Sequence, residues 1–261
     1  MTDKIDRIAQ FIKAAHEAGD GFANLEGDLA PDDVPEAYAA QDRLHALHAA
    51  SGRGLLGGRK IALASQVQQE LCGIDHPIAG GIFADEIMAS PAKVARDTYH
   101  GLGIEFELAV KLGEDVTAAG GPYDADTIRA SIASVHPAFE LIIDRGADYA
   151  NLGAPTMIAD NAWCAGVVLG AEIPGWRDLD LNELPVNLYQ NDDPPVEAKT
   201  GAADPVGSLA WVANLVTSMG HTMRAGEIVI TGSVIKTRYP GAGEHFRYDI
   251  AGLADVLVAI V

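Results

Sequence analysis

The sequence predicts an α+β protein in which a helical N-terminal region packs on a larger, mainly antiparallel β body. Apolar residues recur at helical spacing over roughly the first 52 residues, whereas from Arg59 onward the period changes to two or to short apolar runs. The chain of 261 residues is long enough for a sizeable core, and no repeat or composition break marks a linker. We therefore expect a helical region over residues 1–55 and a β-rich domain over residues 56–261, joined in one continuous fold.

Three helices are predicted in order along the chain. The first contains Ile5, Ile8 and Ile12 at helical spacing and ends at the glycines of residues 19–21. The second begins after Asp33 and ends near Gly52, and the third covers residues 206–221. Strands are predicted where the period is two or where an apolar run is short, at residues 60–64, 103–112, 132–143, 166–171, 184–189, 228–231 and 255–261.

The charge balance excludes some classes of partner. The chain has 37 acidic and 18 basic side chains, a formal charge of −19, which works against binding to nucleic acid or to an anionic membrane surface.

No apolar run approaches the ~20 residues that a membrane helix needs. Cys72 and Cys164 are far apart and form no CxxC motif. The charged N-terminus does not resemble an export signal, so we expect a cytoplasmic protein.

A glycine-rich motif gives only weak evidence of a dinucleotide-binding site. Gly52, Gly54 and Gly57 satisfy G-x-G-x-x-G, but a dinucleotide site needs a strand before the glycines and a helix after them. Here the motif follows a helix and leads into a strand. We expect a flexible loop before the strand that carries Lys60.

The segment of residues 103–112 alternates large apolar side chains with small or charged ones. A strand would place Glu105 and Glu107 on one face, about 6.5 to 7 Å apart along the chain. Those like charges repel each other unless solvent or a cation lies between them. A solvated outer face is the simplest interpretation of this segment alone.

Glu140 argues against a solvated face for these carboxylates, because it lies within an apolar run that is typical of a buried strand. A buried carboxylate must be protonated, paired with a base or coordinated. A pair with Arg145 is one alternative. The other is an oxygen cage for Mg²⁺ or Mn²⁺, formed by Glu140 with Glu105 and Glu107.

Lys60 begins an apolar strand, where a lysine usually points its ammonium toward solvent. If it points inward beside a metal, its pKa should fall, and it could then move protons or stabilise an enolate.

Several motifs, taken in order, resemble the 2-keto-4-pentenoate hydratase and 4-oxalocrotonate decarboxylase group of the fumarylacetoacetate hydrolase superfamily. The resemblance extends over nearly the whole chain. The motifs are Ala37-Tyr38-Ala39-Ala40-Gln41, Arg59-Lys60-Ile61-Ala62-Leu63-Ala64-Ser65, Pro77-x-x-Gly80, Glu105-x-Glu107, Pro137-Ala138-Phe139-Glu140, Ile158-Ala159-Asp160-Asn161-Ala162, Leu209-Ala210-Trp211-Val212-Ala213-Asn214 and residues 226–233.

The resemblance implies a roll of mixed β-sheets around the active site, a helical N-terminal region and assembly into homo-oligomers. It also implies Mg²⁺ or Mn²⁺ held by the three glutamates, with Lys60 as the active-site lysine. Ser65 and Ser233 are expected to bind substrate.

The implied substrates are 2-hydroxy-dienoates and 2-oxo acids from aromatic catabolism. A metal-dependent hydratase acting on 2-hydroxypenta-2,4-dienoate is the first expectation. The alternatives are a 4-oxalocrotonate-type decarboxylase and a non-catalytic partner subunit, since hydratases and decarboxylases of the group can form complexes with each other.

Three positions depart from the group's hydratase pattern, in which Asp often stands at Ile78, Ser at Trp163 and Thr at Ala64. The site is therefore expected to be more apolar than that of a standard hydratase. Ser233 also departs from the Gly-Thr pattern of the hydrolase members, which favours the hydratase and decarboxylase branch.

Overall fold

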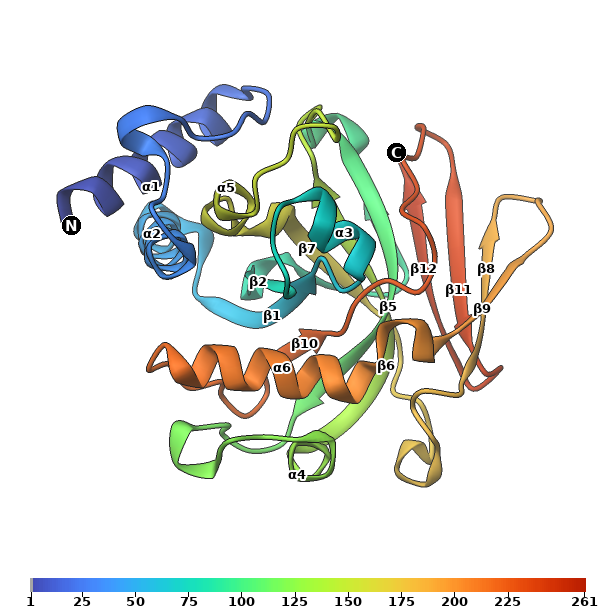
Figure 1. Ribbon diagram of the computed structural model, residues 1–261. Helices are drawn as coiled ribbons and strands as arrows, with labels where there is room; N and C mark the ends of the chain where they lie inside the picture. The colour runs from blue at the N-terminus through green and yellow to red at the C-terminus, as the bar shows by residue number, and fades with distance from the viewer. Residues whose placement is uncertain (1) are drawn as a thin grey trace.

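The computed structural model describes residues 2–261 and confirms the α+β class, with helices packed against mixed sheets. The two expected N-terminal helices, α1 (Thr2–Ala18) and α2 (Val34–His48), lie together at one side of the molecule (Figure 1). Asp33 caps α2 by accepting a hydrogen bond from the backbone N–H of Glu36, which is why the helix begins where the sequence predicts. The third expected helix is α6 (Pro205–Ser218).

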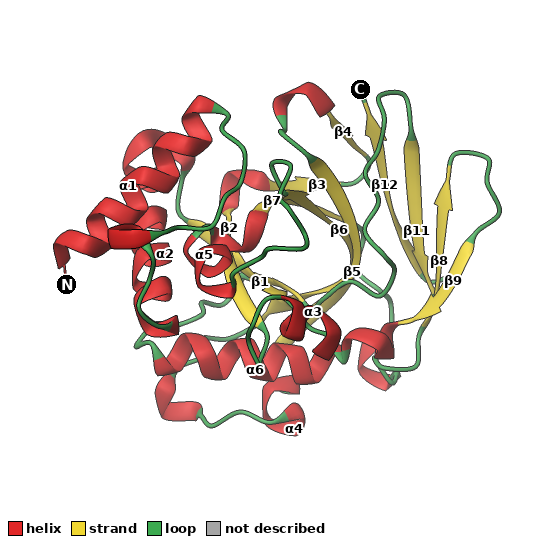
Figure 2. Ribbon diagram, turned by 45° about the horizontal axis from the view of Figure 1, so that its top comes forward, coloured by secondary structure: helices red, strands yellow, loops and turns green. Residues whose placement is uncertain are grey.

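The strands form two sheets, which are seen at the centre and the right of Figure 2. The seven-stranded sheet has the order β2-β1-β10-β5-β6-β7-β3. Its strands are β1 (Leu56–Ala62), β2 (Ile78–Phe83), β3 (Ile87–Ala89), β5 (Leu102–Leu112), β6 (Ile132–Ile143), β7 (Cys164–Leu169) and β10 (Ile228–Ile230). Most neighbouring pairs are antiparallel, but β1 pairs with β10 and β3 with β7 in parallel.

The second sheet has five strands in the order β4-β12-β11-β8-β9. They are β4 (Ala92–Val94), β8 (Pro185–Gln190), β9 (Val196–Lys199), β11 (His245–Ile250) and β12 (Ala254–Ile260). Only β4 and β12 pair in parallel here.

The largest apolar cluster lies between the two sheets and includes the buried side of α6. Phe106 of β5 packs against Phe246 and Tyr248 of β11, with ring centroids 6.3 and 5.9 Å apart. Because successive side chains of a strand alternate between faces, the face of β5 that carries Glu105 and Glu107 points away from this core. The carboxylates therefore lie on the inner side of the curved seven-stranded sheet.

The N-terminal helices are tied to the β body by buried polar contacts. Gln41 of α2 donates hydrogen bonds from Nε2 to the carbonyls of Ala79 in β2 and Ile158 in α5 (Ala154–Ala159). Two more short helices are α3 (Gln66–Leu71) and α4 (Ala125–Arg129).

The first strand begins earlier than expected. Gly57 and Gly58, expected in a loop, belong to β1. A Cβ on Gly58 would lie 2.2 Å from the carbonyl oxygen of Ile228, so only glycine permits this close parallel approach of β1 and β10. Strands β2, β3, β4, β9 and β11 are additions to the expected set. Of these, β11 alternates buried Phe246, Tyr248 and Ile250 with polar residues.

Within residues 2–261, none of the helices combines the length and apolar character needed to cross a bilayer.

Candidate active site

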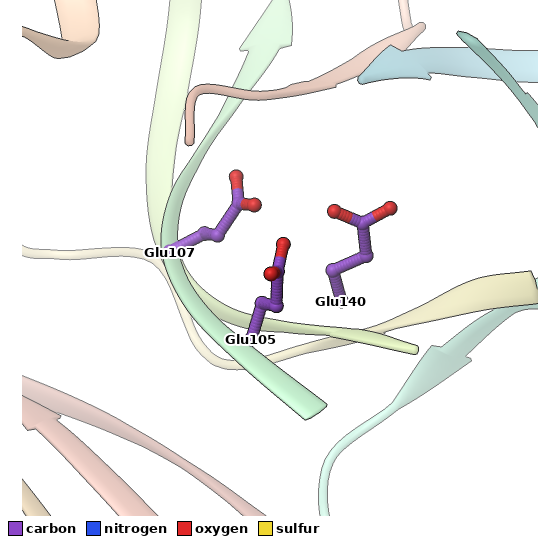
Figure 3. Close-up of side chains that lie close together, drawn as sticks. All are labelled: Glu105, Glu107 and Glu140. Carbon is purple, nitrogen blue, oxygen red and sulfur yellow. The ribbon is translucent and has the colours of Figure 1, made fainter. Parts of the chain in front are cut away.

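The register of β5 and β6 brings the three glutamates together. Glu105 lies directly opposite Glu140 in the antiparallel pair, and Glu107 follows two residues along the same face. One carboxylate oxygen from each of the three residues lies within 4.8 Å of the other two. Figure 3 shows the three carboxylates directed into a common space. Glu107 and Glu140 have no solvent exposure, which excludes the solvated outer face as an interpretation.

The surrounding chain holds two of the carboxylates but leaves other oxygens without partners. The backbone N–H of Gly232 donates to Glu107 Oε2 over 2.7 Å, and Thr237 Oγ1 donates to Glu105 Oε1 over 2.6 Å. Glu107 Oε1 and Glu140 Oε2 are buried and have no hydrogen-bond partner among the described residues. Each unpaired buried acceptor carries a desolvation cost of about 1–3 kcal/mol, more when it is charged, so these oxygens favour a bound cation.

Lys60 points into the protein, beside the glutamates. Its Nζ lies 2.9 Å from Glu140 Oε1 and donates a hydrogen bond of 2.9 Å to the carbonyl of Ala162. The surface interpretation of Lys60 is therefore wrong. Glu140 does not pair with Arg145, whose guanidinium binds Asp160 with Nη2 2.6 Å from Oδ2.

The electrostatics of this group are those of an anionic site. Burial raises the pKa of Glu107, and the charges of Glu140 and Glu105 raise it further. Burial also raises the pKa of Glu140, against the opposing effect of Lys60. Burial opposes the charge on Lys60, but Glu140 and Glu105 outweigh it and raise the pKa of the ammonium. Three ionised carboxylates and one ammonium sum to −3 + 1 = −2, which a divalent cation would neutralise.

The carbonyl that binds Lys60 belongs to an unusual turn. Asn161, Ala162 and Trp163 have φ values of 56°, 48° and 61°, the left-handed region that side chains other than glycine rarely adopt. The side chain of Asn161 accepts from Gly81 N over 2.7 Å and donates to Gly81 O over 2.9 Å. Nε2 of buried His45 donates to the same Asn161 oxygen over 2.7 Å. These contacts fix a conformation that the backbone alone disfavours.

A cavity of about 480 Å³ adjoins Glu105, the one glutamate of the three that is among its lining residues. Lys60, Glu105 and Ser233 line it, whereas Ser65 does not. The Ser65 hydroxyl instead caps α3 by accepting from the backbone N–H of Gln68. The Ser233 hydroxyl donates to the carbonyl of Ile235 over 2.8 Å.

The three positions that depart from the hydratase pattern do not all line the cavity. Ala64 and Trp163 line the cavity. Ile78 is fully buried in an apolar cluster behind the lining.

Two tyrosines of the cavity lining carry no local sequence signal. The hydroxyls of Tyr149 and Tyr239 contact each other, although 90 residues separate them in the chain. Tyr149 also donates to Asp144 Oδ2 over 3.0 Å. The tertiary fold brings the two tyrosines together, so no local sequence pattern could indicate their contact.

The sequence pattern of the fumarylacetoacetate (FAA) hydrolase C-terminal family matches residues 79–261. The chain belongs to this family. It is 33% identical over 254 residues to 2-keto-4-pentenoate hydratase 1 of Dechloromonas aromatica (strain RCB), covering 96% of this chain and 95% of the relative. The 2-keto-4-pentenoate hydratase of Paraburkholderia xenovorans (strain LB400) is 29% identical, over 96% of this chain and 93% of the relative.

A solved structure of another protein has the same fold. The 4-oxalocrotonate decarboxylase from Pseudomonas putida G7, complexed with magnesium and adipate, superposes with a TM-score of 0.90 at 22% identity. The match covers 100% of this chain and 98% of that one. The expected superfamily fold is thereby confirmed.

Proposed function

We propose that this protein is a metal-dependent lyase that hydrates 2-hydroxypenta-2,4-dienoate or a related 2-hydroxydienoic acid of aromatic catabolism. One observation carries the proposal: three glutamates and a buried lysine converge at the end of a cavity large enough for a small acid. Hydratases of 2-keto-4-pentenoate that match nearly the full chain support the reaction class.

Glu105, Glu107 and Glu140 are the residues that would hold Mg²⁺ or Mn²⁺. Hard divalent cations prefer carboxylate oxygens, and the buried oxygens of Glu107 and Glu140 without partners fit that preference. When bound, such a cation supplies Lewis-acid stabilisation of negative charge that develops on a 2-oxo acid.

Lys60 would act on the substrate through Nζ. Glu140 and Ala162 take two of the three directions in which an ammonium can donate, and Lys60 also lines the cavity. The remaining N–H is available to stabilise an enolate oxygen or to pass a proton to the substrate. Ser233 lies in the same lining and would contact the substrate there, whereas Ser65 lies outside the lining.

Decarboxylation is the second candidate, and the apolar part of the lining favours it. Ala64, Ala162 and Trp163 contribute no hydroxyl to the cavity wall. An apolar wall disfavours a strongly hydrated nucleophile more than it disfavours the release of neutral CO₂.

Two incubations separate the reactions. With Mg²⁺ present, formation of 4-hydroxy-2-oxopentanoate from 2-hydroxypenta-2,4-dienoate supports hydration. Release of CO₂ from 2-oxohex-3-enedioate supports decarboxylation. If neither substrate turns over while the metal is bound, the substrate assignment is wrong.

The metal is tested independently by thermal unfolding. Mg²⁺ at about 100 times its Kd should stabilise the protein by about 2.7 kcal/mol, and EDTA should reverse the effect. Glu140→Gln should lose this response. Glu183→Gln is the matched control, because Glu183 is exposed and pairs only with exposed Lys199. Equal responses of the two variants would remove the carboxylates as ligands.

We further propose that the protein is cytoplasmic and forms a homo-oligomer. A complex with a related hydratase or decarboxylase, in which this chain is a non-catalytic partner, is the alternative to an active enzyme. Size-exclusion chromatography with light scattering tests the assembly, and turnover by the isolated protein would exclude the non-catalytic role.

A further inference from the structure

Two tyrosines at the mouth of the cavity form a chain of hydroxyls that ends on a buried carboxylate. Tyr149 and Tyr239 both line the cavity, and they are 48% and 52% exposed, so they lie where solvent water enters. The Tyr149 hydroxyl donates to Asp144 Oδ2 over 3.0 Å and contacts the Tyr239 hydroxyl. Asp144 is 7% exposed, and its Oδ1 accepts from the backbone N–H of Gly146 over 2.9 Å.

The direction of these hydrogen bonds follows from the number of protons. A tyrosine hydroxyl has one proton to donate, and that of Tyr149 goes to Asp144. Tyr239 is therefore the donor in the contact between the two hydroxyls. Its oxygen keeps a lone pair for a hydrogen bond from a molecule in the cavity. A proton received there can pass along the chain of hydroxyls to Asp144.

The backbone places these hydroxyls close to the three glutamates. Arg238 pairs with Ile104 of β5 in an isolated antiparallel bridge. Thr237 therefore lies beside Glu105, to which its hydroxyl donates. Tyr239 follows two residues later on the same face, about 6.5 to 7 Å further along the chain. A substrate whose 2-oxo acid group binds at the glutamates can then reach Tyr239 with the carbons beyond C2.

The charged residues of the lining do not supply a free base for water. They are Lys60, Lys236 and Glu105. An ammonium group has no lone pair to accept a proton, and Glu140 and Glu105 raise the pKa of Lys60 further. Glu105 accepts from Thr237 and belongs to the cluster that would hold the cation. The tyrosine pair, in contrast, leads to a carboxylate outside that cluster.

We propose that Tyr239 is the catalytic residue that takes a proton from the attacking water, and that Tyr149 relays a proton to Asp144. This inference rests on the proposed function, because it assigns the group that activates water in that hydration. Tyr239 would touch the water itself, whereas Tyr149 and Asp144 would act through it.

The relay balances the addition of one water molecule to the 2-oxo-3-enoate, the keto tautomer of the dienol. As the water oxygen bonds to C4, the electron pair of the C3=C4 bond moves toward C2 and forms an enolate. The water proton goes to Tyr239, the Tyr239 proton to Tyr149, and the Tyr149 proton to Asp144. Lys60 then protonates C3, and exchange with solvent restores Asp144 and Lys60.

Two reactions separate the activation of water from the chemistry at C3. Hydration of 2-hydroxypenta-2,4-dienoate needs both, whereas exchange of the C3 protons of 2-oxopentanoate in D₂O, followed by NMR, needs no attacking water. With Mg²⁺ present, Tyr239→Phe, Tyr149→Phe and Asp144→Asn should each lower kcat for hydration by about 10²-fold or more. Each variant should exchange the C3 protons at a rate near that of the wild type. Calorimetry should give an unchanged Kd for 2-oxopentanoate.

Tyr189→Phe is the matched control. Tyr189 lies on β8 of the second sheet, outside the cavity lining, and its ring packs against the guanidinium of Arg247 at 3.8 Å. This variant should keep both reactions.

The outcomes distinguish the relay from the proposed function. Undiminished hydration by Tyr239→Phe or Asp144→Asn overturns the relay, and so does a loss of exchange or of 2-oxopentanoate binding that parallels the loss of hydration, since that pattern indicates a structural role. These results leave the proposed function intact, because the wild-type protein still hydrates the dienoate. If the wild-type protein does not hydrate the dienoate, the relay and the proposed hydration are both wrong.

Discussion

Replacing Asn161 with alanine should weaken the turn that presents the Ala162 carbonyl to Lys60. The substitution removes three hydrogen bonds, two with the backbone of Gly81 and one with His45, and leaves their buried partners unsatisfied. At the lower limit of about 1 kcal/mol for each group, the loss is about 3 kcal/mol. Alanine also tolerates φ of 56° less well than asparagine, which adds about 1 kcal/mol.

The expected total of about 4 kcal/mol is large against a typical stability of about 5–15 kcal/mol. Urea denaturation should show it as a lower midpoint with an unchanged slope. Asn161→Gly should lose about 1 kcal/mol less, because glycine accepts the left-handed conformation. Both variants should lower kcat, since the Ala162 carbonyl no longer holds Lys60 Nζ in place.

Asn191→Ala is the control for the cost in stability of placing alanine at a positive φ. Asn191 also has a positive φ, 52°, but it lies at the end of β8, where its side chain binds Glu244 and the backbone of His245. This variant should lose about 1–2 kcal/mol and keep its kcat. If Asn161→Ala costs no more than Asn191→Ala, or leaves kcat unchanged, the reasoning about the turn is refuted.

Three further predictions concern chemistry, pH and packing. Lys60→Ala should lower kcat by roughly 10²-fold or more, with near-native circular dichroism; retained activity would exclude Lys60 from the chemistry. Burial lowers the pKa of His45 to about 4, so below pH ~6.5 the unfolded chain takes up a proton that the folded chain excludes. The contribution of His45 to stability should therefore fall by up to about 3 kcal/mol as the pH drops from ~6.5 to ~4. The difference in stability between the wild type and His45→Gln, measured by urea titration at several pH values, should change by this amount. Gly58→Ala should cost several kcal/mol, because its Cβ would lie 2.2 Å from the Ile228 oxygen; a melting temperature near wild type would contradict that packing.

The cluster of three glutamates could be predicted because part of its signal is local. Alternation in β5 sets the common face of Glu105 and Glu107, and the apolar surroundings of Glu140 indicate a buried carboxylate. Their opposition across β5 and β6 depends on register, which no single segment specifies. That Glu140 contacts Lys60 and not Arg145 likewise depends on tertiary packing, and the sequence did not indicate it.

For β1, β2 and the turn at Asn161, the local sequence was misleading or gave no indication of the structure. Gly57 and Gly58 have the composition of a loop, yet the close approach of β10 requires glycine within β1. β2 is buried along its whole length, so it lacks the alternation by which a half-buried strand is recognised. The left-handed turn at Asn161 is stabilised by His45, 116 residues earlier in the chain, and could not be inferred from its own sequence.

The hydrogen bonds from α2 to the β body constrain how relatives of this protein could be recombined. Gln41 and His45 donate hydrogen bonds to the carbonyl of Ile158 and the side chain of Asn161, so α2 is matched to α5 and the turn after it, more than 100 residues away. A chimera that joins α2 of one homologue to the sheets of another would mismatch these pairs even with every carboxylate retained. A crossover between α1 and α2 keeps them within one parent. It then has to match the apolar contacts of Ile8 and Ile12 and three ion pairs of α1, which join Lys4 to Glu36, Asp6 to Arg43 and His16 to Asp160. Block exchange in this fold should therefore succeed more often at that junction than at the boundary between helices and strands.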